Sequence, residues 1–233
     1  MFIVVKRKTI VSVILIVGLI FAMAGTGVFL SQKEVFAARK NFVVVIDAGH
    51  GGADKGVVGK NGLIEAELNL EISLLLEKKL TDSGFGAVMT RKTQEGLYGD
   101  SLKNFKARDF AERKRIIAEA DPDVVVSIHA NKFPQSEKRR GIQVFYNSSS
   151  KEGKDFATCL QKSLNVLNEK YVGKTFSPLA GEYFMLNCTK KPSVIIECGF
   201  LSNEEDEALL SLPEYKEELT DAILLGIMEH VGS

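Results

Sequence analysis

Three apolar runs of strand length constrain the fold of this chain more than any other feature. They are residues 42–46, 124–128 and 193–196, and the polar residues that follow them are Asp47, His129 and Glu197. Runs without polar alternation are typical of strands buried on both faces. Helical patterns separate the runs, which is the order expected of a parallel sheet with crossover helices. The sequence therefore predicts a three-layer α/β/α domain with a mostly parallel central sheet.

Periodicity and the positions of glycine and proline place the remaining elements. Further strands are predicted at 86–90, 142–146 and 183–186, and helices at 68–80, 106–119, 151–168, 204–211 and 214–231. The stretches 49–62, 92–105 and 131–140 are rich in glycine or polar residues and are expected to be loops. Because no internal repeat is evident, residues 42–233 are expected to form one domain.

Four polar residues are expected to meet at one edge of this sheet. His50 follows the first strand, His129 ends another, and Glu197 lies near the carboxyl end of a third. The carboxyl ends of parallel strands share one edge, which is where ligands bind in open α/β sheets. The helices that cross back over the sheet start at the same edge, so Glu65, just before the leucine-periodic helix, is expected beside the other three.

Two histidines and one glutamate, with a fourth position left open for water, form a known catalytic zinc set. Such an ion lowers the pKa of water to about 7 and so supplies a nucleophile. A further carboxylate is then free to act as general base, and Glu197 is suited to this role. Glu67 and Glu71 compete with Glu65 for the third ligand position, and the same set suits other divalent ions.

Each of these residues also has an interpretation that needs no metal. A histidine after a strand is more often a packing residue, and Glu65 suits the first turn of a helix because of the helix dipole. His230, in the last helix, is interpreted as structural. Arg91 and Arg113 suit either a substrate carboxylate or buried structural carboxylates, and the structural role is favoured.

Five separated motifs resemble the zinc-dependent N-acetylmuramoyl-L-alanine amidases of the Amidase_3 family. They are residues 45–52 (VIDAGHGG), 62–70 (GLIEAELNL), 89–91 (MTR), 127–131 (SIHAN) and 196–203 (IECGFLSN). The resemblance implies one zinc ion held by His50, Glu65 and His129, and it favours Glu65 over its competitors. It also implies that Glu197 is the catalytic acid and base. The bond cleaved would be the amide between N-acetylmuramic acid and L-alanine in peptidoglycan.

Residues 103–113, 128–134 and 212–215 are similar to the sporulation- and germination-specific (CwlD-type) subgroup of this family. This similarity implies a role in spore cortex maturation, where removal of the stem peptide precedes formation of muramic-δ-lactam. A deacetylase would act next in that pathway. Whether a helper protein outside the membrane is required stays open.

The first 37 residues indicate export. A basic cluster at residues 6–8 precedes an uncharged apolar stretch, residues 9–32, which is long enough to span a bilayer. Val35–Ala38 suits a signal-peptide cleavage site, so residues 1–37 are either a cleaved signal peptide or an N-terminal membrane anchor. The domain is expected outside the cytoplasmic membrane in either case, on the cortex side of a forespore if the role is sporulation. It would contact the membrane only if the segment is not cleaved.

Three alternative functions are compatible with parts of this pattern. A zinc peptidase acting within the stem peptide would use the same metal chemistry, and a non-catalytic wall-binding protein would keep the metal. A cysteine hydrolase would pair Cys198 with His129, but adjacent strand residues such as Glu197 and Cys198 point to opposite faces. The formal net charge of zero gives no reason to expect a nucleic-acid partner.

Overall fold

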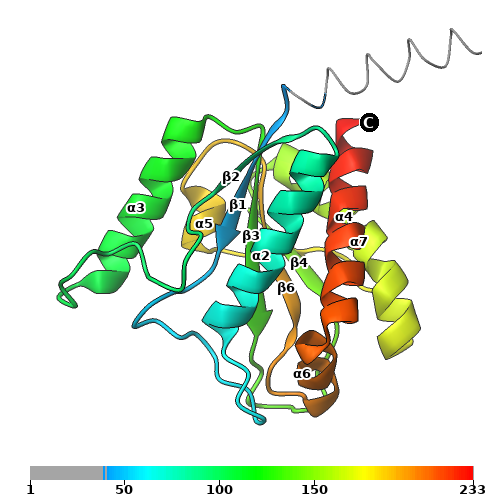
Figure 1. Ribbon diagram of the computed structural model, residues 1–233. Helices are drawn as coiled ribbons and strands as arrows, with labels where there is room; N and C mark the ends of the chain where they lie inside the picture. Colours follow the sequence, from blue (N-terminus) through cyan, green and yellow to red (C-terminus); the bar gives the residue numbers. More distant parts are fainter. Residues whose placement is uncertain (1–38, 40, 233) are drawn as a thin grey trace, which may run out of the picture.

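The computed structural model describes residue 39 and residues 41–232, and their elements alternate between strands and helices (Figure 1). In chain order they are β1 (Val43–Ala48), α2 (Glu65–Asp82), β2 (Gly86–Met89), α3 (Phe105–Ala120), β3 (Val124–Asn131), β4 (Gln143–Tyr146), α4 (Lys151–Val172), β5 (Leu179–Ala180), α5 (Phe184–Asn187), β6 (Ser193–Phe200), α6 (Glu204–Ser211) and α7 (Pro213–Val231). The proposed signal peptide or anchor, residues 1–37, lies outside the described residues. Within the described part of the chain, none of the helices has the length and apolar character needed to span a bilayer.

The strands form one sheet in the order β2-β1-β3-β6-β4-β5. The first four are parallel to one another, β4 runs antiparallel to β6, and β5 runs parallel to β4. The predicted three-layer domain with a mostly parallel sheet is therefore confirmed. Strands β1, β3 and β6 lie next to one another, which brings their carboxyl ends to one edge.

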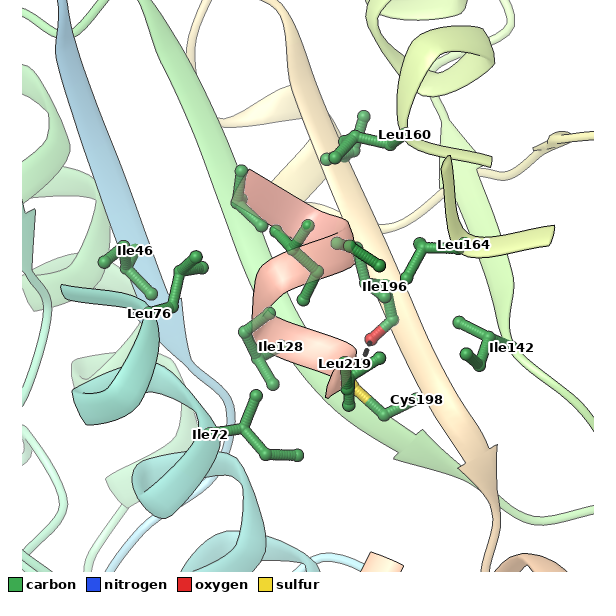
Figure 2. Close-up of a cluster of buried hydrophobic side chains, with 14 of the residues drawn as sticks. Ile46, Ile72, Leu76, Ile128, Ile142, Leu160, Leu164, Ile196, Cys198 and Leu219 are labelled. Atoms are coloured by element: carbon green, nitrogen blue, oxygen red, sulfur yellow. Dashed lines mark hydrogen bonds between the residues drawn. The ribbon is translucent and has the colours of Figure 1, made fainter. Parts of the chain in front are cut away.

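The main hydrophobic core fills the space between one face of the sheet and helices α2, α4 and α7. Alternate residues of each strand point to this face, and Ile46, Ile128 and Ile196 are fully buried there beside leucines of the helices (Figure 2). Cys198 lies on the same face as Ile196, two residues on.

The opposite face of the sheet has a much smaller core under helices α3 and α5. Val45, Val125 and Ile195 of the strands pack there against Ile117 of α3 and Met185 of α5. By alternation, Asp47, Ser127, His129 and Glu197 project toward this same face. Within the described part of the chain, α3 and α5 are the helices that cover these four strand residues, whereas Glu65 reaches the same edge of the sheet from the start of α2.

The predicted strand at 183–186 is wrong, because Phe184–Asn187 is the short helix α5. Met185 and Leu186 are adjacent and both buried. A strand would send them to opposite faces, whereas one helical turn lets both pack against the sheet. The two-residue strand β5 was not predicted. The other strands and helices agree with the sequence-based expectation to within a few residues, apart from helix 151–168, which extends to Val172.

We predict that Gly226→Ala destabilises the domain, although alanine favours a helix by about 1 kcal/mol. A Cβ atom at Gly226 of α7 would lie 2.8 Å from the Leu160 Cα of α4, and backbone there cannot rotate away. Overpacking of this kind costs about 1–3 kcal/mol. Urea unfolding measures the change, with Leu225→Ala, whose side chain is 60% exposed, as the control. Equal stability of Gly226→Ala and the unaltered protein would contradict the packing argument.

Candidate functional site

His50 lies two residues beyond the end of β1, in the glycine-rich loop that begins at Gly49. Its own backbone is left-handed, with φ at 60°. A Cβ atom at Gly49 would lie 2.3 Å from the His129 ring, so the absence of a side chain there lets the two histidines approach each other. Their ring centroids are 5.0 Å apart. The His50 ring places Nδ1 3.0 Å from Asp54 Oδ2 and Nε2 3.2 Å from Glu65 Oε1.

Glu65 is the first residue of α2, and only 3% of its side chain is exposed. Its Oε1 lies 3.0 Å from His129 Nδ1 and accepts a hydrogen bond from Ala130 N at 3.2 Å. Its Oε2 accepts from Val57 N at 2.7 Å. Burial raises the pKa of this carboxyl, but the two histidines outweigh burial and the net shift is strongly downward. Glu65 is therefore held as a carboxylate.

These three residues converge from three separate elements. One ligand atom from each of His50, Glu65 and His129 lies within 4.8 Å of the other two. The competing residues Glu67 and Glu71 are exposed on the outside of α2, where Glu71 pairs with Lys216. Geometry thus brings Glu65 into the cluster and leaves both competitors out.

Glu197 lies beside the cluster because β6 pairs with β3 in a register that sets it opposite His129. Its Oε2 is buried and has no hydrogen-bond partner among the described residues. Burial raises the pKa of this carboxyl to about 7, with a further upward contribution from Glu65 and a downward one from the histidines. A carboxyl with such a pKa can both accept and donate a proton near neutral pH.

Two buried arginines hold the backbone that carries His50. Arg113 of α3 pairs with Asp47, donates to Ala48 O at 2.8 Å and donates to His50 O at 2.6 Å. Arg91 donates to Ala48 O at 3.0 Å and to Gly49 O at 2.9 Å. Both guanidinium groups are engaged with buried backbone carbonyls, and Arg113 also with buried Asp47, so these contacts agree with the structural interpretation of both residues.

Sequence reasoning did not identify Asp54, which lies four residues after His50. The only signal was its place in a glycine-rich turn, since the bridge between Gly51 and Asp54 closes the loop back on the histidine. Burial lowers the pKa of His50, but the Glu65 and Asp54 carboxylates reverse this effect and the net shift is upward. His230 packs on the Phe156 ring at 4.8 Å in the opposite layer, in agreement with a structural role.

Comparison with known proteins identifies the family. The family model described as N-acetylmuramoyl-L-alanine amidase (Amidase_3) matches residues 44–229, which is most of the chain and includes all four site residues. The chain belongs to the Amidase_3 family. It is therefore an enzyme, an N-acetylmuramoyl-L-alanine amidase that acts on peptidoglycan.

Individual relatives agree with this assignment and indicate one subgroup of the family. The amidase is 33% identical to the germination-specific N-acetylmuramoyl-L-alanine amidase of Bacillus subtilis over 81% of this chain and 79% of that protein. Among solved structures, it resembles the CwlD amidase from Clostridioides difficile in complex with the GerS lipoprotein, with a TM-score of 0.75, 33% identity, and coverage of 82% and 99% of the two chains. It also resembles the catalytic domain of CwlV from Bacillus (Paenibacillus) polymyxa, with a TM-score of 0.68, 29% identity, and coverage of 82% and 98%. These similarities support a CwlD-type amidase.

The family assignment decides against the alternative functions. A peptidase and a non-catalytic wall-binding protein are not supported, because named amidases account for the match along the whole domain. The cysteine hydrolase also fails on geometry. Cys198 is fully buried in the main core, on the face of the sheet away from His129, and burial raises the pKa of its thiol far above the ordinary value.

We predict that Arg113→Leu lowers the free energy of unfolding by about 3–5 kcal/mol, because it leaves the Asp47 charge buried without its partner. Arg115→Leu is the matched control on the same helix, since the ion-pair partners of Arg115 within the described residues are the half-exposed Glu112 and the exposed Glu119. That control should unfold at nearly the same denaturant concentration as the unaltered amidase. Urea titration followed by circular dichroism measures both. A small effect of Arg113→Leu would show that the pair is not a structural requirement.

Proposed function

We propose that the amidase is zinc-dependent, with one ion held by His50, Glu65 and His129 and with Glu197 as the catalytic acid and base. The observation that carries this proposal is the convergence of two ring nitrogens and one buried carboxylate oxygen within 4.8 Å. Nitrogen and oxygen donors in this ratio suit zinc in hydrolases. The donors are also held in place by other groups, which is what a site needs to bind an ion without rearrangement.

The contact between Asp54 and His50 supports the assignment of the histidine as a ligand. Metal-binding histidines commonly use one ring nitrogen for the ion and the other for a carboxylate that fixes the ring. Asp54 occupies Nδ1 at 3.0 Å, so Nε2 is the nitrogen that faces Glu65 and the cluster. Glu65 is fixed in the same way by hydrogen bonds from Val57 N and Ala130 N.

The proposed reaction is hydrolysis of the amide between the lactyl group of N-acetylmuramic acid and L-alanine. Zinc bound at this site would supply Lewis acidity, which lowers the pKa of water and polarises the amide carbonyl. Glu197 accepts a proton from the attacking water at its carboxylate. The same residue then donates that proton to the amide nitrogen while the carbon–nitrogen bond breaks. Glu197 lines a hollow beside His129, and its Oε2 has no hydrogen-bond partner among the described residues that would compete with these transfers.

We further propose that this activity belongs to spore cortex maturation. The similarity to a germination-specific amidase supports that role. Removal of the stem peptide from muramic acid would expose the lactyl carboxyl group, and a deacetylase acting afterwards would allow muramic-δ-lactam to form. The complex of a CwlD amidase with a lipoprotein supports the proposal that a helper protein outside the membrane binds this amidase as well.

The division of the chain into an N-terminal segment and a catalytic domain bears on where the enzyme is located. We propose that residues 42–233 form the catalytic domain and that residues 1–37 direct it through the membrane as a signal peptide or an anchor. The basic cluster at residues 6–8 and the uncharged stretch at 9–32 support export. Peptidoglycan, the substrate of the family, lies outside the cytoplasmic membrane, which is consistent with this location.

We predict that Glu197→Gln retains zinc but lowers kcat by about 10²–10⁴-fold, because glutamine cannot transfer the proton. His129→Ala should lose both zinc and activity. The full-length chain is purified, zinc is measured by elemental analysis, and release of stem peptides that begin with L-alanine is followed by mass spectrometry. Hydrolysis at the normal rate by Glu197→Gln would overturn the mechanism. Full activity of a chelator-treated, metal-free enzyme would overturn the zinc assignment.

The cortex role predicts that deleting the gene in the producing bacterium yields spores whose cortex lacks muramic-δ-lactam. The reason is that the lactam forms only where the stem peptide has been removed. Muropeptide analysis of purified spores measures the lactam directly. Complementation with the unaltered gene should restore it, and complementation with Glu197→Gln should not. Normal lactam content in the deletion strain would contradict this role.

A further inference from the structure

Two hollows lie on opposite sides of His129. The first is lined by His50, Asp54, Phe105 and Lys106 among other residues. The second is lined by Tyr183, Phe184, Ile195 and Glu197. His129, Phe110 and Met185 line both hollows and therefore lie between them. Because β1 and β6 flank β3 in the sheet, the two hollows are arranged across the strand ends.

The substrate has two unlike halves that must lie on opposite sides of the bond that breaks. One half is the lactyl group with its muramyl sugar, and the other is the stem peptide that starts with L-alanine. The orientation of the two halves rests on the proposed function, in which Glu197 donates a proton to the amide nitrogen. That nitrogen, and the alanine that carries it, must therefore face the hollow that contains Glu197. The carbonyl carbon then lies between the two hollows, and the lactyl group with its sugar extends toward the hollow beside His50.

The lining of each hollow suits the half of the substrate assigned to it. The hollow around Glu197 is otherwise largely apolar: Ile195 and Met185 are buried at its base, and Tyr183 and Phe184 are 44% and 43% exposed at its rim. An alanine methyl group loses water favourably against such a surface. The hollow around His50 is also mainly apolar, but the charged groups of Asp54 and Lys106 line it beside the Phe105 ring, which suits a sugar with hydroxyl and acetamido groups.

Two aromatic contacts hold the outer walls of the hollows. The Phe184 ring packs against the Phe110 ring at 4.7 Å, which links α5 to α3 across the site. The Phe105 ring packs against the Tyr98 ring at 5.2 Å on the other side. Phe184 lines only the second of these two hollows and Phe105 only the first. These two residues are therefore placed to act on different halves of the substrate.

We propose that the hollow around Glu197 is the subsite for the first residue of the stem peptide, with Phe184 limiting the size of its side chain. The hollow beside His50 is the subsite for the muramyl sugar, with Phe105 as its apolar wall. The orientation of the substrate across β1, β3 and β6 follows from these two assignments. Neither aromatic residue takes part in the proton transfer, so both are specificity residues.

A crossed experiment with two variants and three synthetic substrates tests the assignment. The reference substrate is N-acetylmuramoyl-L-Ala-D-Glu, the second has L-valine in place of L-alanine, and the third has a lactyl group in place of the whole sugar. Phe184→Ala should raise the valine-to-alanine ratio of kcat/KM by roughly tenfold or more, because it enlarges the peptide subsite. Phe105→Ala should lower the preference for the sugar-bearing substrate by roughly fivefold or more, the usual effect of truncating an aromatic contact.

Each variant serves as the control for the other, because each ratio compares two substrates on the same enzyme. Phe184→Ala should leave the sugar preference unchanged, and Phe105→Ala should leave the valine-to-alanine ratio unchanged. Exchanged effects would show the reverse orientation, and two unchanged ratios would show that the hollows are not subsites; either result overturns the proposal. Zinc content and the thermal midpoint are measured for each variant, and Phe184→Leu replaces Phe184→Ala if the latter does not fold. Undiminished hydrolysis by Glu197→Gln would instead refute the proposed function from which the orientation is derived.

Discussion

The buried ion pair between Arg113 and Asp47 is the interaction on which the site depends. Both side chains are almost completely buried, so neither charge is tolerable without the other. Arg113 also donates through Nε to Asp109 of its own helix and through its other nitrogens to the carbonyl groups of Ala48 and His50, which ties α3 to the end of β1. This tie explains how His50 keeps a left-handed backbone, a conformation that costs about 1–3 kcal/mol in a residue other than glycine. Packing elsewhere stabilises the strained turn, and the turn aims the imidazole at Glu65.

Glu65 completes this arrangement because its two oxygens have different tasks. Oε2 accepts from Val57 N and holds the glycine-rich loop against α2, while Oε1 faces both histidines. A carboxylate surrounded by donors stays ionised even when it is buried. The candidate ligands therefore come from the loop after β1, from α2 and from β3, and their geometry depends on the docking of all three elements. Loss of tertiary structure would separate them, so metal affinity and folding are expected to be coupled.

Sequence periodicity was sufficient to predict the layers and the parallel strands. It also predicted that His129 and Glu197 lie together, because the carboxyl ends of parallel strands share one edge of the sheet. It could not separate Glu65 from Glu67 or Glu71. All three lie near the start of one helix, and only contacts with β3 and the 55–63 loop bury the first of them. The short helix α5 was missed for a similar reason. Four residues carry too little periodicity to distinguish a turn of helix from a strand, and packing of Met185 against the sheet decides the outcome.

The unequal covering of the two sheet faces explains where function resides in this fold. Helices α2, α4 and α7 bury one face in a continuous apolar core, which supplies most of the hydrophobic stabilisation. On the other face, α3 and α5 leave the strand ends partly open, and polar groups at Asp47, His129 and Glu197 replace apolar packing there. Such groups weaken a core unless each one is paired or used. Asp47 is paired with Arg113, whereas Glu197 Oε2 has no partner among the described residues. Among the buried carboxylate oxygens that the structure describes, the one without a hydrogen-bond partner thus belongs to the residue that the proposed chemistry uses for proton transfer.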